Sequence, residues 1–287
     1  MANTEAHSLS LPQIGSLNLG LLPGALALSA EANWNQVAAD WRLMIGHGHA
    51  IGIEMGQPPS LVASALALPM GARLAWISMV LVTASQRRLG LASRLVLDCI
   101  QWIEARGAQA VLDATAAGAE VYRPLGFETL RYITRWQHPG NAVASPRRGV
   151  MPLSASDMAW LAPLDAQIFG AERDFVLHDL LARPDAVCLR GADQDGYVLS
   201  RAGRVATQIG PLLAPEPDMA IRLLDGLLSR LPGPVFIDAY NDQVEFSAHL
   251  AALGFTRQRG FERMMRGGIT QFGDNFRSFA AAGPELG

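Results

Sequence analysis

The spacing of apolar residues along this chain predicts an alternation of strands and helices. The segments 61–68 and 72–82 are almost wholly apolar and are separated by Pro69 and Gly71, which is typical of two buried strands joined by a turn. From 91 to 103 the apolar positions recur every three or four residues, as on one face of a helix. The pattern of the first half therefore predicts an α/β layer fold with a mixed sheet. Its expected elements are a helix at 30–45, strands at 49–55, 61–68 and 72–82, a helix at 91–103, a strand at 110–114, a helix at 117–125 and a strand at 128–136.

The same order of features occurs twice. Asp113-Ala114-Thr115 leads to Leu125-Gly126-Phe127 in the first half, and Asp238-Ala239-Tyr240 leads to Leu253-Gly254-Phe255 in the second. A strand, a helix and a Gly-Phe closure recur at matching positions, so the chain contains an internal repeat.

The repeat and a change in composition divide the chain. Residues 137–148 hold prolines, a glycine and small residues without any period, which is typical of a linker. We therefore expect a first domain at 1–138, a linker at 139–149 and a second domain at 150–287. The expected elements of the second domain are helices at 156–169, 174–183, 219–231 and 244–253 and strands at 186–190, 196–201, 205–212, 235–238 and 262–265.

The turn from Ser85 to Ala92, between the last apolar strand of the pair and the next helix, has the features of a phosphate site. Gly90 and Ala92 leave little side chain where the helix begins, so free backbone N–H groups can approach a ligand closely. The helix dipole favours anions at that end, and Arg87 and Arg88 add positive charge. The turn therefore predicts binding of a phosphate group.

Three segments of the first half together match one protein family. They are the turn Gln86 to Ala92, the phrase Leu112 to Thr115, and the Tyr-x-x-Leu-Gly-Phe within Val121 to Phe127. With them, residues 74–136 resemble the core of a GNAT-type N-acetyltransferase, with one departure at Ala84, where a proline is common. In this family the Arg-x-x-Gly-x-Gly/Ala turn holds the pyrophosphate of acetyl-CoA.

The resemblance implies a fold, an activity and a set of residues. The fold would be two GNAT-like domains, each a mixed central sheet flanked by helices, and the activity an acyl-CoA-dependent transfer of acetyl from acetyl-CoA to a primary amine by direct attack. Tyr122 matches the family tyrosine that points toward the CoA sulfur, so it is the candidate general acid. The implied CoA-binding residues are Val80, Leu81, Val82, Arg87, Arg88, Leu89, Gly90, Leu91, Ala92 and Ser93.

The sequence leaves the general base open. The amine must be neutral when it attacks, and many family members carry a glutamate on the central strand, but 73–82 contains no acid. Glu172 is the acid of most interest, because a carboxylate reaching over from the second domain would bind a cationic amine or act as its base. The other candidates are Glu54, Asp113, His47, His49 and Asp174, and a chain of waters is a further option.

The second copy lacks the phosphate-binding turn. The segment Gly210 to Asp218 stands in its place and has no arginine pair. Pro215 and Pro217 remove backbone donors, and two acidic residues in the same segment would repel a phosphate. We therefore expect one CoA per chain, with the second domain forming a wall of the acceptor site.

Composition narrows the remaining classes of function. A formal net charge of −3 gives no strong attraction to nucleic acid or an anionic membrane. The polar first ten residues do not fit a signal peptide. Cys99 and Cys188 lie in apolar surroundings, which favours free thiols in a reducing compartment. We expect a cytoplasmic enzyme that needs no metal and acts on a small-molecule or peptide amine, with no nucleic-acid or membrane partner.

Two other classes of protein stay open. A CoA-binding regulatory protein or sensor would keep the pocket without turnover, and the missing acid on the central strand is compatible with this alternative. A scaffold for partner proteins would bind no CoA at all. The sequence does not identify the acceptor, the length of the acyl chain or the oligomeric state.

Overall fold

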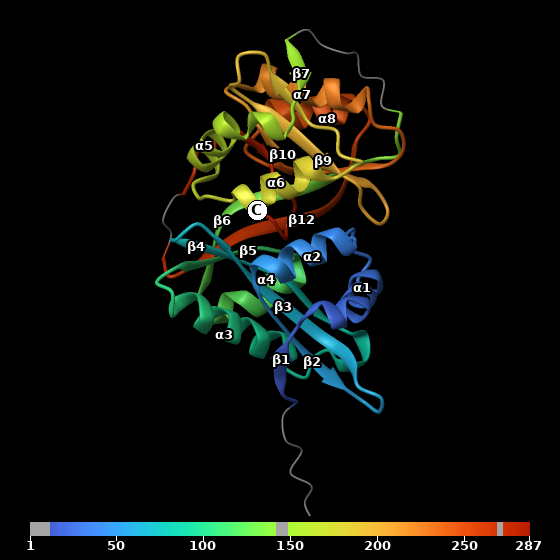
Figure 1. The fold of residues 1–287 in the computed structure, drawn as a ribbon, viewed down its shortest axis with the longest axis vertical. Coiled ribbons are helices and arrows are strands. Elements are labelled where there is room, and N and C mark those ends of the chain that lie inside the picture. Colours follow the sequence, from blue (N-terminus) through green and yellow to red (C-terminus); the bar gives the residue numbers. More distant parts are fainter. Residues whose placement is uncertain (1–11, 142–148, 269–271) are drawn as a thin grey trace, which may run out of the picture.

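The computed structural model describes residues 12–141, 149–268 and 272–287, which share one long mixed sheet with helices packed along it (Figure 1). The elements of the first half are β1 (Ile14–Ser16), α1 (Leu22–Glu31), α2 (Ala38–His47), β2 (His49–Met55), β3 (Ser60–Met70), β4 (Leu74–Val82), α3 (Leu91–Glu104), β5 (Gln109–Ala114), α4 (Ala116–Tyr122) and β6 (Phe127–His138). Those of the second half are β7 (Val150–Pro152), α5 (Met158–Phe169), α6 (Asp174–Ala182), β8 (Leu189–Gly191), β9 (Tyr197–Arg201), β10 (Thr207–Leu213), α7 (Pro217–Leu228), β11 (Val235–Tyr240), α8 (Val244–Ala252), β12 (Thr256–Arg266) and β13 (Ser278–Ala280). The expected α/β class is confirmed.

The two halves exchange strands at the centre of the sheet. Among the described residues the order is β1-β2-β3-β4-β5-β12-β6-β11-β13-β10-β9-β8-β7. A strand that follows β5 and α4 would ordinarily lie beside β5, but β12 of the second half takes this place, and β6 pairs with β12 and β11. Arg263 on β12 binds both carboxylate oxygens of Asp113 on β5, each at 2.8 Å. The sequence predicted one sheet for each domain, whereas the structure has a single continuous sheet. The boundaries at 138 and 150 stay a prediction.

Three buried clusters of apolar side chains hold the helices on the sheet. β3 is buried on both faces, which explains its nearly unbroken apolar sequence. Ala63, Ala65 and Ala67 face the cluster under α3, while Leu66, Leu68 and Met70 face the cluster that includes α1, α2, α5 and α6. A third cluster lies under α7 and α8. The side chains of α3 that the helical spacing places on one face are all buried: Leu91, Leu95, Val96, Cys99, Ile100 and Ile103.

Each half contains one parallel strand pair that opens into a gap. β4 and β5 pair only from Leu74 to Trp76, and β10 and β11 pair only from Thr207 to Ile209. In the second half the gap is filled, because β13 pairs with β10 on one side and β11 on the other. The chain passes so close to β10 that a Cβ at Gly210 would overlap the carbonyl oxygen of Ala281. After β13 the chain ends between the two halves (Figure 1).

The helix expected at 30–45 is wrong, because α1 ends at Glu31 and α2 begins at Ala38. Asn35 holds the intervening segment against the second half: its side chain donates to the Ala206 carbonyl at 2.9 Å and accepts the Val205 N–H at 2.9 Å. These contacts join residues 171 and 170 positions apart, so the local period of apolar residues could not reveal them. The sequence prediction also lacked the three-residue strands β1, β7 and β13, which are too short to show a period. Within the described ranges, no helix is long and apolar enough to cross a bilayer.

Candidate active site

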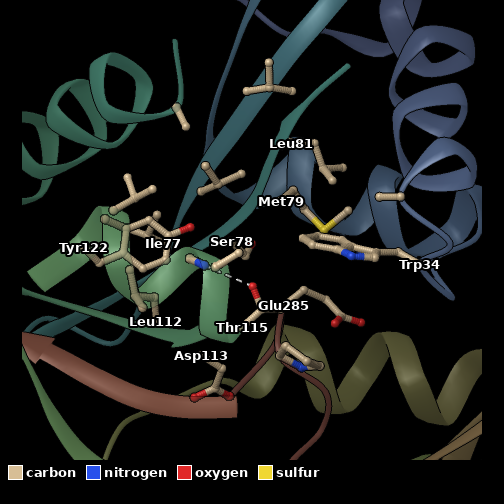
Figure 2. A pocket seen from close by; sticks show the side chains of 18 of the residues that line it. Trp34, Ile77, Ser78, Met79, Leu81, Leu112, Asp113, Thr115, Tyr122 and Glu285 are labelled. Carbon is tan, nitrogen blue, oxygen red and sulfur yellow. Dashed lines mark hydrogen bonds between the residues drawn. The ribbon is translucent and has the colours of Figure 1, made fainter. Parts of the chain in front are cut away.

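A cavity of about 590 Å³ lies where β4 separates from β5 (Figure 2). Its walls include residues of 77–82 on β4, of 86–93 at the start of α3, and of 112–122 on β5 and α4. The structure therefore brings together the central strand, the basic turn and the Tyr-containing helix that the sequence singled out. Residues of the second half complete the lining: Arg259, Phe261, Pro284 and Glu285.

The wall formed by β4 is an interrupted strand. Met79 has a φ of 51°, and the register between β3 and β4 shifts next to it. Ser64 on β3 stabilises this bulge by donating its hydroxyl to the Met79 carbonyl at 2.8 Å. Beyond Trp76, the strand pairing described for β4 is with β3 alone, so its other backbone edge faces the cavity. Such an edge can pair with an extended ligand.

The turn after β4 presents the N-terminus of α3 to the same cavity. Gly90 is the N-cap of α3 and has a φ of 76°. Apart from Gly90 and its two chain neighbours, no described atom lies within 4 Å of the position that a Cβ on Gly90 would take. Gly90 and the first three residues of α3 line the cavity, and the free N–H groups and the dipole at a helix N-terminus suit an anion. Arg87 and Arg88 also line this end.

The start of the turn is anchored by the last residue of α1. The carboxylate of Glu31 accepts the Ala84 N–H at 2.6 Å and the Thr83 hydroxyl at 2.7 Å. The Ala84 N–H and the Thr83 hydroxyl hold the pKa of this carboxyl below its usual value. Glu31 thus fixes the position of the chain before the arginines without itself lining the cavity.

Tyr122 lies at the end of α4 and borders the cavity (Figure 2). Its side chain is packed against Phe127, with the ring centres 6.0 Å apart, and is 8 % exposed. A Cβ at Gly118 would come within 3.0 Å of the ring, so the glycine leaves the space that the ring occupies. Burial raises the pKa of Tyr122 above its usual value, so the phenol keeps its proton at neutral pH.

Two charged residues at the cavity are held by ion pairs. Asp113 receives the bidentate contact from Arg263, and Arg135 on β6 makes a bidentate contact with Asp238 at 2.8 Å. Burial raises the pKa of Asp113, while Arg263 opposes that effect. The carboxylate of Asp113 is thus engaged in holding β12 to β5.

Two other polar residues keep an atom without a partner. Glu285 is 3 % exposed, and its Oε1 accepts from Nη2 of Arg201 at 2.5 Å, but its Oε2 accepts no hydrogen bond from any described residue. Gln36, in the segment between α1 and α2, is 7 % exposed, and its Oε1 likewise has no partner within the described ranges. Both residues line the cavity, and each has one buried side-chain oxygen for which the described residues supply no donor.

Sequence reasoning did not find Glu285 or Gln36. Glu285 is a single acid in the otherwise apolar and small segment 279–287, and this isolation is the one signal that the sequence offered. Gln36 was assigned to the interior of a helix that does not form.

Two predicted site residues do not line the cavity. The side chain of Leu89 is 60 % exposed and is not part of the lining, although its neighbours on both sides contribute to it. Glu172 is exposed and lies against Gly71, in the turn between β3 and β4. That turn is at the opposite end of β4 from the basic turn, so the structure does not bring Glu172 to the cavity.

The remaining candidate bases also lie outside the lining. His47 stacks on Phe175, with the ring centres 4.6 Å apart. His49 stacks on Trp102 and contacts Asp98 at 2.9 Å. Glu54 is exposed on β2, and Asp174 begins α6.

Comparison with known proteins identifies the family. A model of the "Acetyltransferase (GNAT) family" matches residues 28–127, and a model of an "Acetyltransferase (GNAT) domain" matches residues 161–280. The uncharacterized N-acetyltransferase YitH of Bacillus subtilis is 26 % identical over 239 residues, which cover 81 % of this chain and 83 % of the relative. The chain belongs to the GNAT superfamily of N-acetyltransferases and carries two GNAT domains.

Solved structures share this two-domain fold. A protein of Pyrococcus horikoshii assigned as an acetyltransferase superposes with a TM-score of 0.82 at 16 % identity, over 99 % of this chain and 100 % of the other. A tandem GNAT protein from the clavulanic acid biosynthesis pathway superposes with a TM-score of 0.63 at 13 % identity, over 91 % and 100 % of the two chains. The tandem arrangement inferred from the internal repeat is therefore confirmed by the two family matches and by these shared folds.

Proposed function

We propose that this protein transfers the acetyl group of acetyl-CoA to a primary amine by direct attack, in the cavity beside β4. The observation that carries the proposal is the shared lining of that cavity: an open strand edge, a helix N-terminus with two arginines, and a buried protonated tyrosine. These are the groups needed for an extended thioester arm, a pyrophosphate and a leaving thiolate.

Different residues bind different parts of acetyl-CoA. Backbone groups of Val80, Leu81 and Val82 face the pantetheine arm. The turn from Arg87 to Ser93 takes the pyrophosphate, through the N–H groups at the start of α3 and the guanidinium groups. The side chain of Leu89 has no part in this binding, so only its backbone can contribute.

Tyr122 serves as the general acid of the reaction. The neutral amine attacks the thioester carbon, a C–N bond forms, and the C–S bond breaks. The departing thiolate takes the proton of the phenol. Because burial keeps this phenol protonated, the proton is available across the physiological range of pH.

The second domain takes part by completing the acceptor side of the cavity. Arg259, Phe261, Pro284 and Glu285 come from it. It does not offer a second gap for CoA, since β13 fills the space between β10 and β11. The proposal therefore includes one acetyl-CoA per chain. It also places the reaction in the cytoplasm, in keeping with Cys99 and Cys188 as free thiols.

Titration calorimetry and thiol release test the proposal together. We expect acetyl-CoA to bind with a stoichiometry of one, and thiol release to depend on an added primary amine from a panel of amino acids, polyamines, aminoglycosides and peptides. Binding without thiol release from any amine would favour a CoA-binding sensor. A stoichiometry of two, or an absence of binding, would contradict the proposed site.

A further inference from the structure

We propose that Glu285 takes the proton from the ammonium group of the acceptor, and that Gln36 holds the same group by accepting a second hydrogen bond. This inference rests on the proposed function and adds to it the residue that makes the amine nucleophilic. The acid that the family often places on the central strand is thus supplied by the segment that follows β13.

Several contacts fix the position of Glu285. Arg201 on β9 fixes the carboxylate through Oε1, and the same guanidinium contacts Asp40 on α2 at 3.2 Å and the Ala282 carbonyl. Trp76 donates its indole N–H to the carbonyl of the neighbouring Pro284 at 3.0 Å. These contacts leave Oε2 as the one carboxylate oxygen of Glu285 that no described residue binds. A buried oxygen without a donor costs free energy, which a bound ammonium group would recover.

Gln36 adds a second, independent observation. Its Oε1 is also buried without a hydrogen-bond partner in the part of the chain that the structure describes, and it lines the same cavity. Both unpaired atoms are acceptors, whereas an ammonium group carries only donors. Trp34, two residues before Gln36, provides an aromatic wall (Figure 2), and a cation is favoured over the face of such a ring. The acceptor end of the cavity therefore fits a protonated primary amine.

The charged groups that shift the pKa of Glu285 come from three elements. Burial raises the pKa of this carboxyl, and Asp40 on α2 acts in the same direction, while Arg201 on β9 and Arg135 on β6 oppose it. Asp113 and Arg259 line the same cavity. A carboxylate with a raised pKa is a stronger base, and it remains ionised above that pKa.

The protons balance in the following way. The ammonium group transfers one proton to Oε2 of Glu285, which later releases it to solvent. The neutral amine attacks the thioester carbon, the C–N bond forms, and the C–S bond breaks. The thiolate takes the phenol proton of Tyr122, and the second proton lost by the nitrogen restores the phenol.

The test compares Glu285→Gln with wild type and with Glu172→Gln, a matched change of an exposed glutamate outside the cavity. The assay is thiol release from acetyl-CoA at pH 7.4 with the best primary amine of the panel. We expect kcat/KM to fall about 10²- to 10³-fold in Glu285→Gln, since an amine with a pKa of about 10.4 is neutral in only about one molecule in 10³ at this pH. We expect Glu172→Gln to keep the wild-type rate. We expect Gln36→Met to raise KM for the amine more than it lowers kcat.

A pH profile separates a base from a structural residue. In Glu285→Gln, kcat/KM should rise tenfold per pH unit toward the pKa of the amine, so that the deficit shrinks to less than about tenfold near pH 10. The deficit should also be smaller with trifluoroethylamine, whose ammonium group is far more acidic. A deficit that is the same at every pH and for both amines would show a structural role and overturn the inference.

Acetyl-CoA affinity distinguishes this inference from the proposed function. If Glu285→Gln binds acetyl-CoA like wild type and keeps its rate at pH 7.4, the inference fails and the proposed function stands. If the wild type itself releases no thiol with any amine, both fail. Should Glu285→Gln fail to fold, Glu285→Asp tests the same point, because the shorter carboxylate would lower kcat while keeping the charge that Arg201 binds.

Discussion

Replacing Gly90 by alanine tests both the backbone conformation of the basic turn and its role in binding. Gly90 has a φ of 76°, where an L-residue is strained, while the position of its Cβ meets no described atom within 4 Å. Any loss of stability therefore comes from the backbone and not from a steric clash. Gly46 near the end of α2 is the matched control, because its Cβ position is also open and its φ lies outside the positive region.

The structure gives opposite signs for the two substitutions. The left-handed conformation costs an alanine about 1–2 kcal/mol, from which the lower entropy of the unfolded chain recovers about 0.5. In α2 the same substitution should stabilise by about 0.5–1 kcal/mol. The free energies of unfolding should thus differ by about 1–2.5 kcal/mol. For a chain of this size each kcal/mol corresponds to roughly 2–4 °C in Tm.

Binding should respond at Gly90 alone. Gly90 lines the cavity at the start of α3, where the proposal places the pyrophosphate, so a methyl group and a changed backbone there would disturb the N–H groups that bind it. Losing one hydrogen bond to a charged group costs about 1.5–3 kcal/mol, so acetyl-CoA should bind about 10- to 100-fold more weakly. Gly46→Ala should bind as wild type does.

Urea unfolding and titration calorimetry give the two readouts. A Gly90→Ala variant as stable as Gly46→Ala would refute the left-handed assignment. A Gly90→Ala variant that is destabilised but binds acetyl-CoA with wild-type affinity would refute the placement of the pyrophosphate.

Three further variants test the general acid, the positive charge of the turn and the ion pair between the two halves. Tyr122→Phe should lower kcat about 10²-fold or more and keep acetyl-CoA affinity, because it removes the proton and preserves the packing; an unchanged kcat in thiol release would exclude the phenol as the acid. Arg87→Ala together with Arg88→Ala should weaken acetyl-CoA binding and make it less dependent on the concentration of NaCl. Calorimetry at two salt concentrations measures both effects, and an affinity and salt dependence equal to those of wild type would contradict the prediction. Arg263→Met should lower the free energy of unfolding in urea by about 3–5 kcal/mol, because Asp113 is left buried and unpaired; a loss below about 1 kcal/mol would contradict this account of the ion pair.

The part of the site that depends on local sequence could be predicted. A turn between a strand and a helix is specified by the residues that form it. The local sequence around Arg87, Arg88 and Gly90 therefore predicts both the position of the turn and its positive charge. Tyr122 was found because α4 and the Gly-Phe closure lie within a few residues of it. The structure brings these two segments to one cavity, as the resemblance implied.

The acceptor side could not be predicted, because it is built from contacts between distant segments. Glu285 reaches the cavity only because β13 sits between β10 and β11, and a three-residue strand leaves no pattern in a sequence. The exchange of β6 and β12 is equally hidden, since the pairing of β12 with β5 joins residues far apart in the chain, such as Met264 and Leu112. Glu172 was considered for its charge and domain, but nothing in the sequence places it at the far end of β4.

The segment from Ser278 to Gly287 closes the gap in the second half and also contributes to the cavity in the first half. Residues 278–280 form β13 and fill the gap between β10 and β11. Glu285, seven residues after Ser278, lines the cavity beside β4. Reopening the second gap would withdraw Glu285 from the first. A chain of this architecture that keeps Glu285 at the cavity beside β4 therefore has no open gap between β10 and β11.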